Sequence, residues 1–150
     1  MEVFRISKTD YADKLTSSGS ANRWNYHGQH VIYTGSSRSL STLELIVHRG
    51  TIIPKIEYKV MVISIADDDK LVRQILVKDL AKDWRKMSAY AVLQKTGSEW
   101  YENQETLVLK VPSAVIPKEY NYIINTEHPD FLKYVQLIRT EEYFWDTRLF

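Results

Sequence analysis

The segment that most constrains the fold is Tyr58–Ile65, which is nearly continuous in apolar, mostly β-branched residues. Its length suits a strand, and an apolar run without polar alternation is typical of a strand that is covered on both faces. Asp67, Asp68 and Asp69 follow it and predict a turn. The sequence therefore predicts a β-sheet with this strand near its centre and other elements packed on each side.

The chain before this strand predicts two further strands joined by a flexible loop. Residues 3–6 and 30–34 have the composition of short strands, and residues 16–22 are rich in Ser, Gly and Asn. Since both ends of the loop continue into strands, we expect it to present Arg23 and Trp24 at the edge of the sheet.

A helix is predicted over residues 40–47, where leucine and valine recur at spacings of three and four. The repeating residues are Leu40, Leu43 and Val47. Ser39 or Ser41 is the expected N-cap, and Gly50 is the expected stop. Glu44 shares the face of the repeat, where a carboxylate is costly unless it has a partner. Its placement therefore needs an explanation.

The second half of the chain predicts an alternation of strands and helices. Residues 106–111 form the expected strand that ends at Pro112, because proline cannot donate to a sheet ladder, and Ser113 is thereby held at a strand terminus. Residues 71–77 fit a strand and a helix almost equally, so both assignments stay open. The other expected elements are a helix over residues 87–94 that continues to Trp100, a strand over residues 121–125, a helix that begins at Pro129 and carries Phe131, Leu132, Val135 and Ile138, and an edge strand over residues 142–145.

Composition sets the class of protein. The 150 residues suit one domain, 1–150, and no apolar run approaches the roughly 18 residues that a membrane span needs. The sequence lacks cysteine, which excludes disulfides and zinc–thiolate sites and favours a cytoplasmic location. Twenty Lys and Arg against 19 Asp and Glu give a formal charge of +1, so we expect no direct binding of nucleic acid.

Four polar side chains from separated segments stand at the edges of apolar runs. They are Arg23, Tyr33, Glu44 and Ser113. A polar group at such a position needs a hydrogen-bond partner or a ligand, and we expect the four to share one pocket. A cation, an aromatic ring, a carboxylate and a hydroxyl together suit an anionic substrate with a glycosidic bond.

Each of these residues also has a structural interpretation. Arg23 can pair with an acid in its loop, and Tyr33 can pack in the sheet with its hydroxyl at the rim. Glu44 can face solvent if the helix is rotated, and Ser113 can simply shape the turn after Pro112. All four being structural at once is the less economical interpretation.

The histidines give weaker indications. His27 and His30 lie three residues apart, but no third ligand accompanies them, so we predict no metal site. His48 and His128 are expected to form local hydrogen bonds and not to act as an acid or a base.

A set of ordered motifs runs along nearly the whole chain. It consists of Gly19, Asn22-Arg23-Trp24-Asn25, Gly28, Ile32-Tyr33, Leu43-Glu44 with Val47-His48, Val111-Pro112-Ser113-Ala114-Val115, Asn125 with His128-Pro129-Asp130-Phe131, and Arg148-Leu149. In order and spacing, this set resembles the RES domain, a family named for its Arg, Glu and Ser. Because it covers nearly the whole chain, the resemblance is more specific than any single tetrapeptide.

The resemblance implies a fold class, an activity and a partner. RES proteins have an α+β domain related to ADP-ribosyltransferases, with a mixed, split β-sheet and flanking helices. They are the toxins of bacterial toxin–antitoxin pairs and consume NAD as a substrate, with no further cofactor. Their antitoxins are Xre-like DNA-binding proteins that occlude the active site. We therefore expect a hetero-oligomer with such an antitoxin, and a homodimer stays open.

By motif position, the resemblance assigns roles to five residues. The family Arg, Tyr, Glu and Ser correspond to Arg23, Tyr33, Glu44 and Ser113, and Arg5 corresponds to an Arg that often lines the site. The catalytic set is then Glu44, Arg23 and Ser113, and the substrate-binding set is Arg5, Arg23, Tyr33 and Ser113. The chain departs from the family pattern at Ala21-Asn22, where a glycine commonly precedes the Arg, and at Asn125-Thr126, where Asn-Pro is common.

These residue types suit cleavage of the nicotinamide–ribose bond of NAD. Breaking the bond leaves positive charge on the ribose, which Glu44 would stabilise in the transition state. Arg23 and Arg5 would hold the diphosphate, and the ring of Tyr33 would meet the cationic nicotinamide. Ser113 would bond the nicotinamide amide, the ribose or Glu44, and these three roles stay open.

The predicted function is therefore a toxin that degrades NAD. Two alternatives use the same pocket: transfer of ADP-ribose to a protein, and a non-catalytic module that binds a nucleotide or a peptide. An RNA-cleaving toxin fits poorly, because the balanced charge supplies no surface that follows a nucleic-acid backbone. The sequence leaves open whether water or phosphate attacks the ribose.

Overall fold

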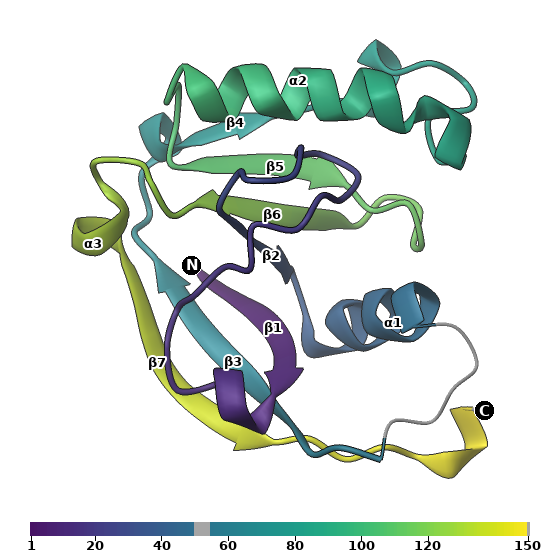
Figure 1. Cartoon of the computed structure of the whole chain (residues 1–150), viewed down its shortest axis with the longest axis vertical. Helices are drawn as coiled ribbons and strands as arrows, with labels where there is room; N and C mark the ends of the chain where they lie inside the picture. The colour runs from purple at the N-terminus through teal and green to yellow at the C-terminus, as the bar shows by residue number, and fades with distance from the viewer. Residues whose placement is uncertain (50–54, 150) are drawn as a thin grey trace.

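The computed structural model describes residues 1–49 and 55–149, which form a single α+β domain with one seven-stranded mixed sheet (Figure 1). The strands lie in the order β4-β5-β6-β2-β1-β3-β7. Only β4 and β5 run parallel among the paired strands of the described residues. The strands are β1 Glu2–Lys8, β2 Val31–Gly35, β3 Tyr58–Ile65, β4 Val72–Gln74, β5 Val108–Pro112, β6 Tyr120–Asn125 and β7 Val135–Glu142. The predicted fold class is confirmed.

The sheet is split between β1 and β2. These strands share one registered pair, Phe4 with Gly35, whereas β1 pairs with β3 from Glu2 to Lys8. On the other side of the split, β2 pairs with β6 along its whole length. The strands β1, β3 and β7 therefore form one half of the sheet, and β2, β6, β5 and β4 form the other, as Figure 1 shows.

Two helices cover one face of this sheet, each over a different half. Helix α1, Arg38–Arg49, follows β2 directly, and helix α2, Tyr90–Glu102, runs alongside β4 and β5 (Figure 1). Leu45 of α1 packs on the cluster that contains Phe4 and Val60, and Leu93 of α2 packs on the cluster that contains Ile123. Val3 of β1 and Ile124 of β6 are the neighbours of Phe4 and Ile123 in the chain. They belong to a third cluster, on the opposite side of the sheet. The two helices therefore cover the same face of the sheet on opposite sides of the split.

Most of the predicted strands are confirmed, at residues 3–6, 30–34, 106–111 and 121–125 and over Tyr58–Ile65. The predicted sheet centre is displaced, because β2 is the middle strand of the order and β3 is second from the edge. Residues 71–77, for which strand and helix were both open, contain the short strand β4 between two 3₁₀ turns, Asp69–Leu71 and Val77–Asp79. The helix expected from residue 87 begins as a 3₁₀ turn, Met87–Ala89, and continues as α2.

The predicted helix from Pro129 to Ile138 is wrong. Helix α3, Phe131–Tyr134, is a single turn, and Val135 begins β7. The apolar spacing suited a helix, but β3 offers an open edge, and pairing with it outweighs the local pattern. The edge strand expected over residues 142–145 therefore lies earlier, and Tyr143 and Trp145 instead pack edge-to-face around Tyr58.

The predicted N-cap of α1 is also wrong. Ser37 caps the helix, since its Oγ accepts a hydrogen bond from Leu40 N at 3.0 Å. Ser41 lies inside the helix and donates to Phe4 O at 2.9 Å, which ties α1 to β1. Val47 was expected on the buried face but is 62% exposed. The predicted stop at Gly50 lies outside the described residues.

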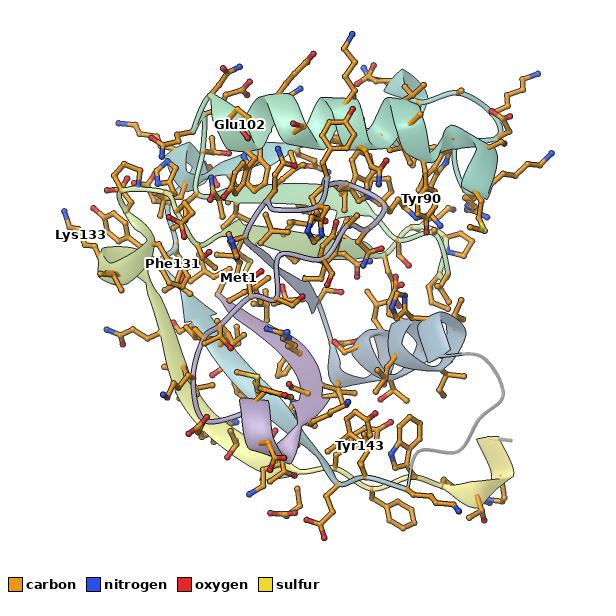
Figure 2. The ribbon with its side chains drawn as sticks, in the orientation of Figure 1. Met1, Tyr90, Glu102, Phe131, Lys133 and Tyr143 are labelled. Carbon is orange, nitrogen blue, oxygen red and sulfur yellow. The ribbon has the colours of Figure 1, made fainter. Side chains whose placement is uncertain are left out.

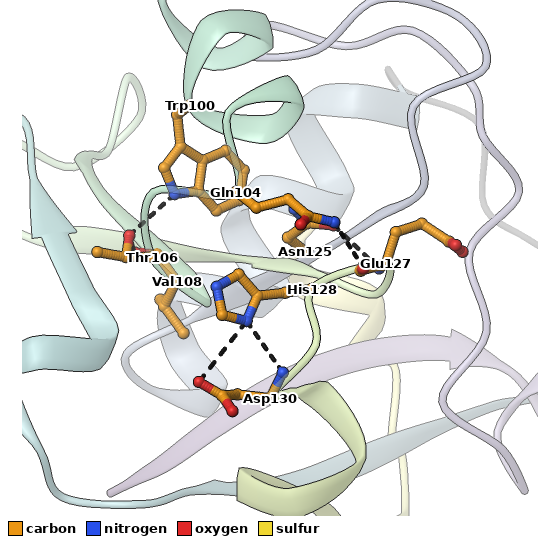
Figure 3. Close-up of polar contacts among 8 residues, drawn as sticks. All are labelled: Trp100, Gln104, Thr106, Val108, Asn125, Glu127, His128 and Asp130. Carbon is orange, nitrogen blue, oxygen red and sulfur yellow. Dashed lines mark hydrogen bonds and ion pairs between the residues drawn. The ribbon is translucent and has the colours of Figure 1, made fainter.

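The late family motif forms a turn that leads into α3 (Figure 3). Asn125 is fully buried, and its Oδ1 accepts from Glu127 N at 2.9 Å. His128 Nδ1 accepts from Asp130 N at 3.1 Å, so this histidine makes the predicted local hydrogen bond. The motif therefore shapes the chain between β6 and β7.

None of the helices among residues 1–49 and 55–149 has the length and hydropathy that crossing a membrane requires.

Candidate functional site

A cavity of about 660 Å³ lies at the split in the sheet. Arg5 of β1, Tyr33 of β2, Glu44 of α1 and Arg23 of the preceding loop all line it. Ser113 is buried beside the cavity and touches Glu44. The structure thus brings together the four residues that the sequence predicted for one pocket and Arg5, which the family resemblance added.

Glu44 enters the cavity from the inner face of α1. Leu40, one turn earlier, is buried and sets this face toward the sheet. Oε1 of Glu44 accepts two hydrogen bonds, from Ser113 Oγ at 2.8 Å and from Asn121 Nδ2 at 2.7 Å. In the described part of the chain no hydrogen bond reaches Oε2. The carboxylate is therefore anchored through one oxygen and keeps the other for a ligand.

Ser113 uses its whole hydrogen-bonding capacity within the protein. Its Oγ donates to Glu44 and accepts from Val115 N and Ile116 N, both at 3.0 Å. A hydroxyl has one donor and two lone pairs, so no part of this group is left for a substrate. Of the three roles left open by the sequence, the geometry fits the bond to Glu44.

Tyr33 lines the cavity with its ring and buries its hydroxyl. The hydroxyl accepts from Trp24 N at 3.1 Å and donates to Asn25 Oδ1 at 2.7 Å. Burial is the largest effect on this group and raises the pKa of Tyr33, although the hydrogen bond from Trp24 lowers it. The hydroxyl therefore holds the loop that carries Arg23, and the ring remains for a ligand.

The variant Tyr33→Phe is expected to destabilise the protein by about 1–3 kcal/mol, because it leaves Trp24 N and Asn25 Oδ1 without their partner. Urea unfolding at neutral pH measures this cost. An unchanged midpoint with an unchanged slope would contradict it.

The same variant should respond differently to alkali. Below about pH 10, tyrosine is protonated in both the folded and the unfolded state. The contribution of Tyr33 to the free energy of unfolding is therefore fully present in that range. Above that pH the unfolded state loses its proton first, because the folded-state pKa is raised, and the free energy of unfolding falls. Wild type should lose up to about 1.4 kcal/mol per pH unit more than Tyr33→Phe in this range. Parallel curves from pH 9 to 11 would contradict the assignment.

Two guanidinium groups make the cavity positive. Arg23 Nη1 donates to the carbonyl oxygens of Trp84 and Arg85 at 3.2 and 3.0 Å, and its guanidinium lies 4.7 Å from the ring centre of Tyr90, at the start of α2 (Figure 2). Arg5 donates to Thr16 O at 2.8 Å, and burial lowers its pKa. Neither arginine takes part in an ion pair among the described residues. Two cations without acid partners suit an anionic ligand.

The loop that carries Arg23 packs closely against α2. Gln94 Nε2 donates to Asn22 O at 2.9 Å, and Trp24 is buried under the helix. At Gly97 the backbones come so close that an added Cβ would lie 1.8 Å from Trp24 O. The helix therefore fixes the position from which Arg23 reaches the cavity.

Sequence reasoning missed three residues of the site. Asn121 bonds Glu44, Tyr90 stacks on Arg23, and Asn25 holds the hydroxyl of Tyr33. Asparagine is depleted in strands, so Asn121 within a predicted strand was the one available signal. Tyr90 lay in the predicted helix over residues 87–94, where nothing distinguished it as a site residue.

A second cavity of about 550 Å³ shares six lining residues with the first, which are Arg5, Ile6, Ala21, Asn22, Tyr33 and His48. Its other lining side chains are largely polar, and they include Lys8 and the serines of the loop. Among residues 1–49 and 55–149, no group of three His, Asp or Glu side chains could hold a metal ion.

Comparison with known protein families matches residues 2–146 to the RES domain. The chain belongs to the RES domain family. Within it, the chain is 32% identical over 153 residues to Toxin Res of Yersinia enterocolitica, with 99% of each protein covered. It is 30% identical over 147 residues to the Prs ADP-ribosylating toxin of Sphingobium sp., with 95% of this chain and 91% of the relative covered. The chain is therefore a RES-family toxin.

The fold of this RES domain matches that of a solved structure. One chain of the M. tuberculosis MbcT–MbcA toxin–antitoxin complex superposes with a TM-score of 0.76 at 16% identity, covering 95% of this chain and 83% of that chain. At this identity the likeness concerns the fold.

Proposed function

We propose that this RES toxin cleaves the nicotinamide–ribose bond of NAD. The observation that carries the proposal is the geometry of Glu44, whose Oε1 is held by two donors while Oε2 is left for a ligand, in a cavity with two arginines that have no acid partner in the described residues. A single fixed carboxylate beside paired cations suits a substrate with a cationic leaving group and a diphosphate.

In this mechanism the glycosidic C–N bond breaks with its electron pair going to the nicotinamide nitrogen. Positive charge develops on the ribose, and Oε2 of Glu44 stabilises it more in the transition state than in the ground state. Water then forms the new C–O bond and releases a proton, giving ADP-ribose and nicotinamide. Arg5 and Arg23 hold the diphosphate, and the ring of Tyr33 stacks on the nicotinamide.

The second cavity supports a dinucleotide as the substrate. Each cavity has a volume within the roughly 300–1,000 Å³ that ligand pockets occupy, and Arg5 lies at their shared wall. A diphosphate at Arg5 would therefore have one nucleoside on each side. This arrangement would explain why a second cavity adjoins the one that contains the Glu44 carboxylate.

The direct test is release of nicotinamide from NAD by the purified protein. We expect NAD to be consumed with equal release of nicotinamide, and intact NAD after prolonged incubation without antitoxin would refute the proposal.

Transfer of ADP-ribose to a protein is the second candidate, favoured by the relative named Prs ADP-ribosylating toxin. NAD labelled in its adenosine half distinguishes them, because the label ends on protein in transfer and in small products in hydrolysis.

Replacement of the Arg5 guanidinium tests whether this group binds the diphosphate of NAD. Arg5→Met should raise KM for NAD roughly tenfold or more, because it removes charge-assisted hydrogen bonds to the substrate, and should change kcat much less. Arg73→Met is the matched control. Arg73 lies on β4, forms a partly exposed ion pair with Glu105 and lines neither cavity. Equal effects of the two variants on KM would contradict the assignment.

The antitoxin is proposed to be an Xre-like protein that covers the cavity. Val47 and Met87 line the cavity and are 62% and 81% exposed, so the mouth carries apolar side chains that suit a protein cover. Addition of the purified antitoxin should suppress nicotinamide release at a fixed molar ratio. Undiminished release in the complex would reject occlusion as the mode of neutralisation.

A further inference from the structure

Asn121 is the second donor to the carboxylate of Glu44. It lies in β6 and is held from both sides, because its backbone is registered with Gly35 of β2 and with Val111 of β5. Its side chain lines the cavity, and Nδ2 donates to Oε1 of Glu44 at 2.7 Å. A rigid central strand therefore delivers this amide to the acid.

The amide can have only one orientation. If it were reversed, Oδ1 would face Oε1 of Glu44, and two acceptors would oppose each other at hydrogen-bond distance. In the observed orientation Oδ1 is buried and has no hydrogen-bond partner among the described residues. A buried amide that served stability would be expected to use both ends, since each unsatisfied group costs free energy. Here the satisfied end is the one on Glu44.

The two donors reach the same oxygen from different elements. Ser113 approaches from the end of β5 and Asn121 from β6, at 2.8 and 2.7 Å. One bond leaves a carboxylate free to turn about it, whereas two fixed donors on one oxygen define the direction of the other.

We propose that Asn121 is a positioning residue for the reaction, which orients Glu44 so that Oε2 meets the ribose. The inference rests on the proposed NAD cleavage. Asn121 is outside the Arg-Tyr-Glu-Ser set of the sequence motifs, and it acts through Glu44, as Ser113 does.

The first test is Asn121→Ala in steady-state kinetics with NAD. We expect kcat to fall roughly tenfold to hundredfold, as expected for the loss of a hydrogen bond to a charged group, while KM changes less than about threefold. Asn103→Ala is the matched control, because Asn103 is exposed after the end of α2 and does not line either cavity. Its kcat and KM should equal those of wild type.

The second test is the pH profile of Asn121→Asp, which a merely structural role would not change. With one shared proton, the new carboxylic acid donates to Glu44 as the amide did, so activity is partly kept. At higher pH both groups ionise and repel, and the orientation of Glu44 is lost. The kcat profile should therefore gain a falling alkaline limb that wild type lacks. Arg5, Arg23 and His48 line the same cavity in both proteins, so a difference between the two profiles is assigned to the substitution.

The outcomes separate this inference from the proposed function. If wild type leaves NAD intact, the proposed function fails. If wild type cleaves NAD but Asn121→Ala keeps kcat, or if Asn121→Asp has the wild-type pH profile, the positioning role fails and the NADase assignment stands. Thermal unfolding of each variant shows whether a loss of kcat comes from unfolded protein, and Asn121→Asp at the pH of its maximum provides a folded, partly active reference.

Discussion

Glu44→Gln should lower kcat for nicotinamide release roughly thousandfold or more, because it removes the only carboxylate that lines the cavity within the described residues. Glutamine has nearly the same shape, and its Oε1 can still accept from Ser113 and Asn121. The variant therefore keeps the geometry and loses the charge. We expect its thermal unfolding to match that of wild type, and its KM for NAD to change only a few-fold. In cells, NAD levels should stay normal when this variant is expressed without antitoxin.

The control for this variant is Glu99→Gln, which removes one carboxylate from the exposed side of α2. It should cleave NAD at the wild-type rate. If Glu44→Gln also kept its activity, the carboxylate would have no role in the chemistry, and a module that only binds a nucleotide would become the better interpretation.

Gly97→Ala should be the most destabilising single substitution, with a cost of about 3 kcal/mol or more. The added Cβ would lie 1.8 Å from the carbonyl oxygen of Trp24, and neither backbone can move without opening the core under α2. Any protein that folds would carry Arg23 in a displaced loop, so KM for NAD should rise as well. Urea unfolding and steady-state kinetics measure the two effects.

Gly28→Ala is the control for Gly97→Ala, and it lies in the loop that Gly97 contacts through Trp24. Gly28 has a φ of +88°, so alanine is strained there, but no atom lies within 4 Å of the added Cβ. Its cost should be about 1–2 kcal/mol, with activity near that of wild type. Similar losses for the two variants would mean that the close approach between α2 and the loop does not matter.

Two of the candidate site residues could be placed from their neighbours in the sequence. Pro112 ends β5 and leaves Ser113 at the terminus, and the face of Leu40 directs Glu44 toward the sheet. The placement of these two side chains depends on a few residues that are near them in the sequence. The RES resemblance added the ordered spacing that joined these positions into one pocket. The chemical roles of the five residues remain predictions.

What the sequence did not predict depends on distant partners. Phe131, Leu132, Val135 and Ile138 have a spacing that suits a helix, and only the open edge of β3 makes the chain a strand from Val135 onward. Ser37 caps α1 because the chain turns immediately after β2, two residues earlier than composition suggested. Asn121 meets Glu44 only when β6 lies beside β2, and no local pattern contains that neighbour.

The single Phe4–Gly35 pair between β1 and β2 has a consequence for how the protein works. Arg5 lies in the half of the sheet that contains β1, and Tyr33 lies in the half that contains β2. The candidate site is therefore complete only while the two halves are packed together. The proposed dinucleotide substrate would contact both residues and so join the two halves of the sheet. Substrate binding should therefore add to the cohesion of the whole domain, and not merely to the order of its binding site.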